Sequence, residues 1–488
     1  MVKSGNSFSV VIIGAGFSGI CMAIKLLEKG ITDFVILEKA PDLGGTWREN
    51  TYPGAECDVP SALYSFSFEP YPDWEYKWSH QPQILKYIKH CSSKYKVDQH
   101  LKFNQTVKTA TWDEASANWL ITNAEGETYQ ANSIVSAIGQ LHYPSYPSFE
   151  GMDTYKGDSW HSAQWNHDVD LKGKRIGVIG NAASAIQFIP EIADKSSSLT
   201  VFQRTPNWML PKQDRLYRNW EKALVRKIPF LLRLYRLKIW LLGGALFFLM
   251  KDGNRLLRKF YQWQSTNYIK DTISDTELAQ KLVPNFPLGA KRVLFSDNYY
   301  AALNKEDVHL DTTPITKITS AGVDVSDRRS IALDVIIYAT GFKTNPFFQH
   351  ISVTGKNKSD LRDQWKEAPV AYLGMTVSNF PNFFMIYGPN TNLGHNSIII
   401  MSEAQSSYIA QAIDTIQKQN LKSIEVTSEV MMSYHTEIQK RLKTMIWNTI
   451  EKSWYRSADG GNPNNWPGRT MEYMRRVRHF KLEKYKTT

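Results

Sequence analysis

The chain has 488 residues and carries 58 Lys and Arg against 47 Asp and Glu, which gives a formal net charge of +11. At roughly 100–200 residues per domain, this length predicts several domains with large hydrophobic cores and excludes a small disulfide-stapled scaffold. The cysteines Cys21, Cys57 and Cys91 show no CxxC or Cys/His spacing, so no metal site is predicted and a reducing, cytoplasmic compartment is favoured. We interpret the excess positive charge first as a solubilising surface.

The chain opens with a βαβ pattern that contains a glycine turn. We predict strands at 8–13 and 34–37 and a helix at 20–28. Gly14, Gly16 and Gly19 form a GxGxxG pattern, in which glycine permits the tight turn, the approach of a pyrophosphate and close packing of helix on strand. Glu38 ends the second strand, where a carboxylate accepts hydrogen bonds from a ribose and disfavours a 2′-phosphate. This site is predicted to bind FAD or NAD.

The same order of elements recurs further along the chain. We predict strands at 175–179 and 199–203, a turn at 180–185 and a helix at 186–192. Gly180 opens this turn, but Ala182 and Ala185 take the other glycine positions, so a pyrophosphate approaches the backbone less freely. The second strand leads into Arg204 without an acid, and an arginine there suits the 2′-phosphate of NADPH; a plain surface arginine is the alternative. The two sites together predict a flavoprotein that NADPH reduces.

The remaining patterns complete a predicted α/β fold of two dinucleotide-binding Rossmann-like domains, for FAD and NADPH, with a helical insertion in the second. Strand pairs are predicted at 106–123 and 126–135, a linker at 143–147, a strand at 335–338 and helices from Ser402 onward. We assign 1–142 and 381–488 to the FAD-binding domain, 150–213 and 286–380 to the NADPH-binding domain, and 214–285 to the insertion.

An apolar run at 239–250 follows a basic and apolar segment at 225–238. The run is too short to cross a bilayer, which takes about 20 apolar residues. It fits a buried or inter-domain helix, and it also fits a helix in a membrane interface, so residues 225–250 are a candidate peripheral membrane contact. No nucleic acid is predicted as a partner, because the basic residues belong to no recognised binding module.

Short motifs along the chain carry a resemblance to a known family. They are GGTW at 44–47, YPGA at 52–55, CDVP at 57–60, QRTPNW at 203–208, ATG at 339–341 and GPNTN at 388–392. This set resembles type I Baeyer–Villiger monooxygenases, of the class B flavoprotein monooxygenase family, although flavin-containing and N-hydroxylating monooxygenases share the two-nucleotide plan. The resemblance implies FAD and NADPH as cofactors. Beside the glycines and Glu38, the implied contacts are Gly45, Thr46, Trp47, Gly180, Ser184, Arg204, Thr205, Lys212 and Asn392. For Lys212, an exposed lysine is an equal alternative.

The same family has a signature around a histidine, F-x-G-x-x-x-H-x-x-x-W followed by Pro or Asp. Gly157, His161 and Trp165 keep this pattern here, whereas Tyr155 replaces the Phe and Asn166 replaces the last residue. The tryptophan favours the Baeyer–Villiger class over the flavin-containing monooxygenases. His161 is therefore a candidate catalytic residue, and a linker histidine satisfied by its neighbours is the alternative.

Oxygenation of a ketone by a flavin peroxide requires a positively charged residue in the active site. A flavin peroxide attacks a ketone as an anion, so a fixed positive charge is needed beside it. The resemblance assigns this role to Arg292 and assigns its orientation to Asp58; the neighbouring Lys291 keeps a solvated basic turn as the alternative. Several C-terminal residues resemble the part of the family that covers the cofactor, and ordinary aromatic packing explains them equally well: Trp454, Tyr455, Asn464, Asn465, Trp466 and Pro467.

These observations predict an FAD-containing, NADPH-dependent monooxygenase that inserts one oxygen atom of O2 into a ketone and gives an ester or lactone. One alternative keeps the cofactors and oxidises sulfur or nitrogen instead. The other is an uncoupled NADPH oxidase or redox-sensing flavoprotein, which the altered second turn and the imperfect histidine signature favour.

Overall fold

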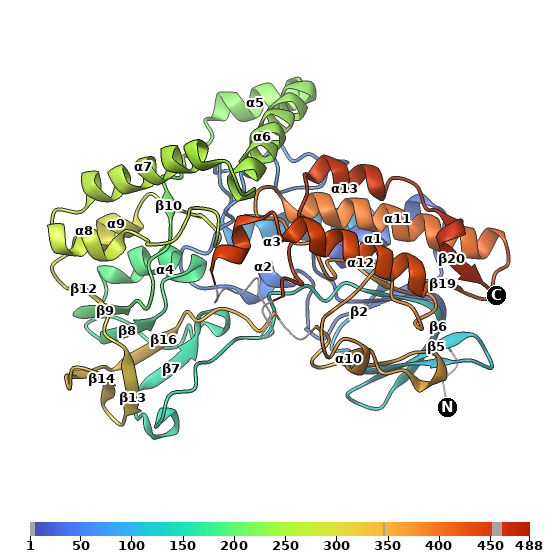
Figure 1. The fold of residues 1–488 in the computed structure, drawn as a ribbon, viewed down its shortest axis with the longest axis horizontal. Coiled ribbons are helices and arrows are strands. Elements are labelled where there is room, and N and C mark those ends of the chain that lie inside the picture. The colour runs from blue at the N-terminus through green and yellow to red at the C-terminus, as the bar shows by residue number, and fades with distance from the viewer. Residues whose placement is uncertain (1–4, 345–346, 451–460) are drawn as a thin grey trace.

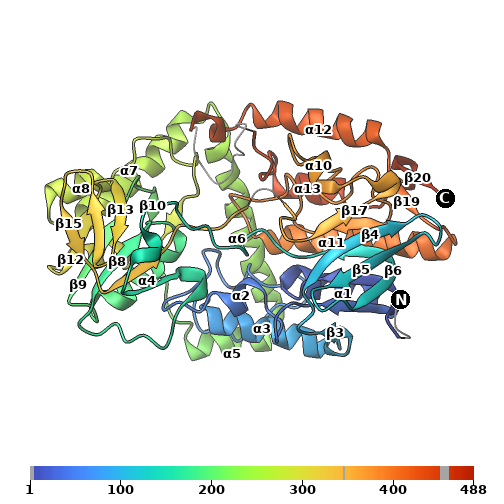
Figure 2. The same ribbon diagram turned by 90° about the horizontal axis from the view of Figure 1, so that it is seen from below.

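In the computed structural model, which describes residues 5–344, 347–450 and 461–488, two sheet-centred domains lie side by side (Figure 1). The first domain is built on an eight-stranded sheet and the second on a five-stranded sheet. Figure 2 shows the two sheets at opposite ends of the molecule, with both chain ends on the first domain. The predicted α/β fold with two dinucleotide-binding domains is confirmed.

The first sheet combines parallel strands with an antiparallel extension. Its strands are β1 Ser7–Ile13, β2 Phe34–Leu37, β3 Leu101–Lys102, β4 Val107–Asp113, β5 Asn118–Asn123, β6 Thr128–Ser136, β17 Ser352–Thr354 and β18 Phe383–Met385. They are ordered β17-β4-β5-β6-β1-β2-β3, and β18 pairs with β6. β2 is buried along its whole length and β1 at its end, which explains why both appear in the sequence as unbroken apolar runs.

Helices surround the first sheet. They are α1 Phe17–Glu28, α2 Thr46–Glu49, α3 Gln81–Lys94, α10 Leu361–Gln364, α11 Ile398–Lys418, α12 Ser428–Leu442 and α13 Thr470–Arg476. α1 packs along α11, so the glycine turn before α1 is covered by the C-terminal part of the chain. Two short strands, β19 Ile424–Val426 and β20 Tyr485–Thr487, interrupt the helical C-terminal region that the sequence predicts.

The second sheet is parallel throughout. Its strands are β7 Asp158–His161, β8 Arg175–Ile179, β9 Ser198–Phe202, β12 Val308–Asp311 and β16 Val335–Tyr338, in the order β12-β9-β8-β16-β7. Helices α4 Ala183–Ala193 and α9 Tyr299–Leu303 pack together, and a small antiparallel sheet is formed by β13 Ile315–Thr319, β14 Gly322–Val325 and β15 Ser330–Ala332. Both glycine-turn helices begin three residues before the predicted starts at 20 and 186, because the last turn residues already form the first helical turn.

Residues 214–285 contain four helices, which are α5 Asn219–Lys227, α6 Pro229–Met250, α7 Arg255–Thr272 and α8 Thr276–Leu282. The short strands β10 Met209–Leu210 and β11 Leu294–Phe295 pair in parallel and close the base of this insertion. At the end of α6, Phe247, Leu249 and Met250 are buried in the core of the first domain, so this part of the apolar run is an inter-domain helix. Among the described residues, no helix combines the length and apolar character needed to cross a bilayer.

The chain returns to the first domain earlier than the predicted boundary at residue 381. β17 pairs with β4 of the first sheet, and Val353 and Trp365 are buried in the core of that domain. The return therefore lies before Ser352. A strand of three residues carries too little alternation of apolar and polar side chains to reveal this in the sequence.

Two segments that connect the domains lie side by side. Pro144 forms an isolated antiparallel bridge with Phe342. The backbone N–H of Ser145 donates to the carbonyl of Gly341 at 2.8 Å, and the N–H of Lys343 donates to the carbonyl of Tyr143 at 2.9 Å. The predicted linker at 143–147 is thus paired with the segment that leaves β16.

Candidate active site

A cavity of about 1110 Å³ is lined by residues of both domains. It reaches both glycine turns, because Gly14 and Gly16 of the first and Gly180 and Ser184 of the second line its wall. One continuous cavity thus joins the two positions where the sequence predicts dinucleotides.

The first turn has the shape that a pyrophosphate site requires. Gly14 has a φ of +102°, and a Cβ on Gly19 would lie 1.9 Å from the carbonyl oxygen of Gly14, so only glycine lets α1 pack this closely on β1. No side chain caps α1 at Gly16, and the residues that begin the helix line the cavity. An uncapped helix N-terminus presents N–H groups and partial positive charge to an anion. The turn therefore fits the pyrophosphate of FAD.

Glu38 lies at the end of β2, beside this turn. Its carboxylate accepts hydrogen bonds from the N–H of Ala15 at 2.7 Å and of Ala40 at 3.0 Å, and the residue is only 6% exposed. Two backbone donors hold the charge beside the cavity, at the position where the sequence predicts a ribose contact.

The second turn repeats the first in spite of its alanines. Gly180 has a φ of +109°, and a Cβ there would lie 2.5 Å from the carbonyl oxygen of Ala339. Ala182 caps α4 with φ −86° and ψ −164°, and Gly16 caps α1 with φ −81° and ψ −167°. Because this conformation is open to any residue, the turn does not need glycine at its second position. The second site therefore keeps the same uncapped helix start for a second dinucleotide.

Three polar side chains gather beside the second turn. The ammonium of Lys291 donates to the hydroxyl of Thr205 at 3.3 Å, and Arg204 also lines the cavity. Burial, together with the positive charge of Arg204, lowers the pKa of Lys291. Two cations held this close favour an anionic ligand between them. In the sequence, Lys291 is predicted only as the alternative of a solvated basic turn, because its place next to Arg292 does not reveal the contact with Thr205.

Lys212 lies elsewhere. Its side chain is buried, its ammonium forms an ion pair with Glu56, and it stands 5.3 Å from the centre of the Trp78 ring. Lys212 is not among the residues that line the cavity, so the structure does not bring it together with Arg204. The predicted contact of Lys212 with NADPH stays a prediction.

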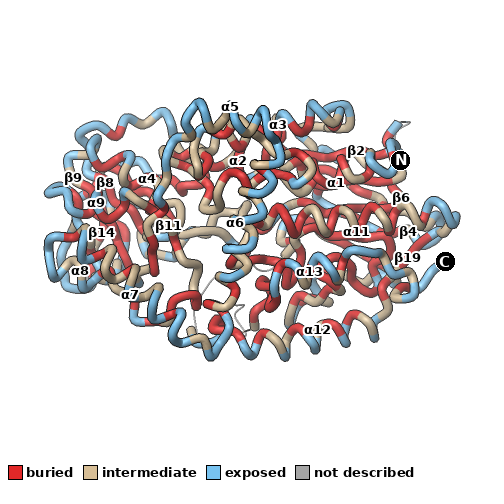
Figure 3. The backbone as a smooth tube through the Cα atoms, turned by 90° about the horizontal axis from the view of Figure 1, so that it is seen from above, coloured by how far each residue is buried: buried red, intermediate tan, exposed pale blue. Residues whose placement is uncertain are grey.

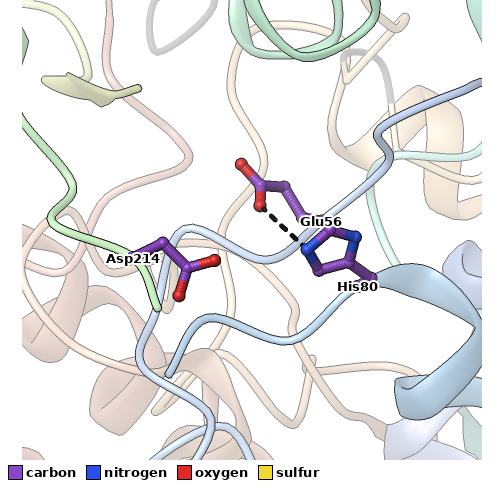
Figure 4. Close-up of side chains that lie close together, drawn as sticks. All are labelled: Glu56, His80 and Asp214. Atoms are coloured by element: carbon purple, nitrogen blue, oxygen red, sulfur yellow. Dashed lines mark ion pairs between the residues drawn. The ribbon is translucent and has the colours of Figure 1, made fainter. Parts of the chain in front are cut away.

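Glu56 also faces His80 and Asp214, and one ligand atom of each lies within 4.8 Å of the others (Figure 4). Glu56 and His80 are 3.8 Å apart, and burial and then Lys212 lower the pKa of His80. The ammonium of Lys212 already pairs with Glu56, and its charge opposes a metal cation at this place. We interpret the group as an ion-pair network that fixes the segment before Asp58.

The YPGA motif joins the two domains. Tyr52 donates its hydroxyl hydrogen to the side-chain oxygen of Gln187 on α4 at 2.8 Å, and the amide of Gln187 donates to the carbonyl of Glu56 at 3.0 Å. A Cβ on Gly54 would lie 2.6 Å from the carbonyl oxygen of Gln187, which explains the glycine. This docking on α4 sets the position of Asp58 a few residues later.

Asp58 and Arg292 form an ion pair on the cavity wall. The Nε and Nη2 atoms of Arg292 lie 2.8 Å and 2.5 Å from the same carboxylate oxygen of Asp58. Both residues line the cavity, and the side chain of Arg292 is 34% exposed and that of Asp58 is 21% exposed. The carboxylate thus fixes the orientation of a guanidinium that faces the space between the two turns.

His161 does not reach the cavity. The side chain is completely buried behind Tyr146 and Phe342, which do line the wall, and its Nδ1 accepts a hydrogen bond from the N–H of Ala163 at 3.1 Å. Burial lowers the pKa of His161 to about 4, so the ring is neutral at ordinary pH. This geometry fits the alternative, a linker histidine satisfied by its neighbours, and a catalytic role of His161 stays a prediction.

The remaining predicted contacts surround the first turn. Gly45 has a φ of +53° and immediately precedes α2, and Thr46 and Trp47 follow it along the cavity wall. The Trp47 ring N–H donates to the hydroxyl of Tyr64 at 3.0 Å, which holds the indole in place.

Asn392 also lines the cavity and belongs to a buried network. Its amide donates to the side-chain oxygen of Asn465 at 2.7 Å, and its own side-chain oxygen accepts from Tyr387 at 2.7 Å. Trp466 is buried and packs on Tyr473. The predictions for Trp454 and Tyr455 lie outside the described residues.

The chain is similar to known proteins over nearly its whole length. Residues 11–220 match the family model described as pyridine nucleotide-disulphide oxidoreductase. A Baeyer–Villiger monooxygenase of Pseudomonas aeruginosa is 40% identical, over 98% of this chain and 91% of its own. The closed crystal structure of cyclohexanone monooxygenase has a TM-score of 0.89 at 26% identity and covers 99% of this chain and 100% of that chain. The crystal structure of the OTEMO complex with FAD and NADP has a TM-score of 0.89 at 27% identity, with the same coverage.

Two dinucleotide turns that open into one cavity define a two-domain, nucleotide-binding flavoprotein. The identity to curated relatives narrows this class further: the chain belongs to the Baeyer–Villiger monooxygenase family. It is an FAD- and NADPH-dependent monooxygenase, as the prediction from its motifs stated.

Proposed function

We propose that the protein inserts one oxygen atom of O2 into a ketone and gives an ester or lactone, with NADPH as the hydride donor. The observation that carries the proposal is the Asp58–Arg292 pair on the wall of the cavity that joins both turns. Water is the second product, because the other oxygen atom of O2 is reduced.

Residues of this chain fit both cofactors. Around the first turn, Glu38 and Trp47 would hold the ribose and the flavin side of FAD. Around the second turn, Arg204, Thr205 and Lys291 would hold the 2′-phosphate of NADPH, because their charges and hydroxyl meet at one place on the wall. Bound FAD supplies the redox chemistry, since it accepts the hydride and reacts with O2.

Arg292 supplies the fixed positive charge that attack on a carbonyl requires. Negative charge develops on oxygen during such an attack, and a cation already oriented before the reaction stabilises it without reorganisation. Asp58 provides this orientation through one oxygen, which accepts a hydrogen bond from Nε and forms an ion pair with Nη2. A monooxygenase that transfers oxygen to sulfur or nitrogen has no need for such a charge, because it uses an electrophilic oxygen.

The cavity favours a ketone with an apolar body. The segment that follows β16 contributes Phe342, Phe347 and Phe348 to its wall. From the first domain, Leu393 and Ile399 also line it. Apolar side chains of this kind bind the hydrocarbon part of a ligand and exclude water from the reacting atoms.

The test is an assay of the purified, FAD-loaded protein with NADPH, O2 and paired substrates. Linear, cyclic and aromatic ketones are offered beside a thioether, and ester, sulfoxide and hydrogen peroxide are quantified against the NADPH consumed. Ester or lactone from at least one ketone is expected. Sulfoxide with no ester from any ketone contradicts the proposal, and so does hydrogen peroxide as the only product.

A further inference from the structure

Exposed apolar side chains gather on the helical insertion. Of the seventeen large apolar side chains that are exposed among the described residues, thirteen lie between Leu216 and Trp263. A folded surface rarely gathers such side chains without a function. We call the exposed apolar and basic side chains of residues 216–263 the insertion surface.

The exposed apolar residues follow helical spacing. On α6, Phe230, Leu234, Leu237 and Leu241 recur at intervals of three and four residues, which places them on one face. On α7, the same spacing joins Leu256, Phe260 and Trp263, which are 85%, 55% and 60% exposed. The faces are therefore organised stripes rather than scattered side chains.

The opposite side of α6 is already fixed to the body. The guanidinium of Arg236 donates to the carbonyl of Ala62 at 2.9 Å, and the side-chain amide of Asn396 donates to the carbonyl of Trp240 at 3.2 Å. A Cβ on Gly243 would lie 2.8 Å from the carbonyl oxygen of His395, so the helix fits closely there. The exposed apolar stripe of α6 therefore lies on the side of the helix that faces away from these contacts.

Most of the net charge of the protein lies on the same segment. Residues 216–263 contain eleven Lys and Arg and two acids, Glu221 and Asp252. They therefore contribute nine of the eleven net positive charges of the chain. Arg233 and Lys238 are exposed between the leucines of the α6 stripe. A second copy of this chain would bring the same positive charge against it, so the complement of this surface is anionic.

The helices that carry the insertion surface share one side of the molecule. In Figure 1, α5 and the beginning of α6 project beyond the domains and α7 lies along the same upper edge; Figure 3 colours parts of α6 and α7 as exposed. A projecting surface that mixes apolar stripes with basic side chains matches a helix lying in a lipid interface, with apolar groups among acyl chains and cations at the phosphates.

We propose that the insertion surface docks the protein on an anionic lipid bilayer. The proposal does not depend on the reaction that the active site performs. The test is co-sedimentation of the FAD-loaded protein with vesicles of phosphatidylcholine alone and of phosphatidylcholine mixed with phosphatidylglycerol. Binding to the anionic vesicles, weakened by salt, is expected, and binding to the neutral vesicles is expected to be much weaker.

Two variants separate the two contributions. Arg233→Gln with Lys238→Gln removes charge, and Leu234→Ser with Leu241→Ser removes apolar area; each pair is expected to weaken binding to anionic vesicles roughly tenfold or more. The matched control is Met432→Ser with Lys440→Gln on α12, which exposes the same kinds of side chain elsewhere and should bind like the wild type. Flavin absorbance and NADPH oxidation show that each variant is folded.

Three outcomes overturn the proposal. The first is wild-type protein that binds neither kind of vesicle, as expected if the partner is an acidic protein. The second is vesicle binding that both insertion variants retain in full. The third is a dimer that the leucine variant converts to a monomer while vesicle binding is absent, which makes a second copy the occupant.

Discussion

Asp58 accepts a hydrogen bond from Nε of Arg292, a residue 234 positions away in the chain, and the same carboxylate oxygen forms an ion pair with Nη2. Asp58 belongs to a segment held against α4 by the Tyr52–Gln187 hydrogen bond, and Arg292 follows the helical insertion. The charge that the reaction needs is therefore positioned by both domains at once.

Replacing Arg292 should uncouple the enzyme. We expect Arg292→Ala to lower the rate of ester formation about 100- to 1000-fold, because the developing negative charge loses its fixed cation. Asp58→Asn keeps the guanidinium but weakens its orientation, so a loss of roughly tenfold is expected. The measurement is ester formed per NADPH consumed. Wild-type coupling in Arg292→Ala contradicts the assignment.

Lys291 should determine the preference for NADPH over NADH. We expect Lys291→Ala to raise KM for NADPH roughly 10- to 100-fold, because a hydrogen bond to a charged phosphate is lost, and to leave KM for NADH unchanged. Lys195→Ala, on an exposed lysine of the same domain, serves as the control. Equal effects on both coenzymes argue that Lys291 only supports the turn.

Lys212 should matter for stability, and KM for NADPH tests its predicted contact with the coenzyme. Lys212→Met leaves the partly buried carboxylate of Glu56 without its cation, so the free energy of unfolding is expected to fall by about 3 kcal/mol. Adding Glu56→Gln should recover part of the loss. Denaturant titration and KM for NADPH are measured together. If Lys212→Met raises KM for NADPH strongly while the free energy of unfolding is unchanged, the predicted contact of Lys212 with the 2′-phosphate is supported instead.

Two glycines of the first turn should respond differently to alanine. Gly19→Ala places a Cβ 1.9 Å from a backbone oxygen, so α1 must leave β1 and the free energy of unfolding should fall by about 4 kcal/mol or more. Gly16→Ala meets only ordinary contact at 3.7 Å and keeps the conformation that Ala182 adopts, so about 1 kcal/mol is expected. Thermal unfolding and the flavin content of the purified protein are the measurements. Similar losses in both variants contradict the steric argument.

Acid should destabilise the fold through two buried histidines. Burial lowers the pKa of His161 and of His395 to about 4, whereas an unfolded histidine titrates near 6.5. The unfolded chain therefore binds more protons between these values, and stability falls as the pH falls through this window. His161→Asn keeps an acceptor for the N–H of Ala163 and does not titrate. From about pH 7 to about pH 5, its free energy of unfolding should therefore fall by about 2 kcal/mol less than that of the wild type.

The comparison for His161→Asn is denaturant unfolding of variant and wild type at both pH values. Retained ester formation at neutral pH is also expected, because the ring lies behind the cavity wall. If His161→Asn is folded but forms no ester, the result supports the predicted catalytic role of His161.

The βαβ units could be predicted from the sequence because each step depends on local pattern. Apolar runs, glycine spacing and the residue that ends the second strand all lie within one short segment, and β16 was placed at the residues where it occurs. The resemblance added Asp58 and Arg292, which no local pattern joins.

The other features could not be predicted, because they depend on contacts between residues that are far apart in the sequence. The contact of Lys291 is with Thr205, 86 positions earlier in the chain, and Lys212 pairs with the partly buried Glu56. His161 kept its motif but turned away from the cavity, because the strand that carries it ends behind Tyr146. β17 was missed because its register is set by β4 and not by its own residues.

The paired connections between the domains constrain how the molecule can move. Because Pro144 and Phe342 form an antiparallel bridge, both connections between the domains pass through the same place. Two connections that are paired at one place can act as a hinge, and the line through them is the natural axis for a rotation of the domains. A rotation of one domain on the other would therefore swing the second glycine turn along an arc relative to the first, and bring Arg204 and Glu38 nearer or farther without stretching either connection.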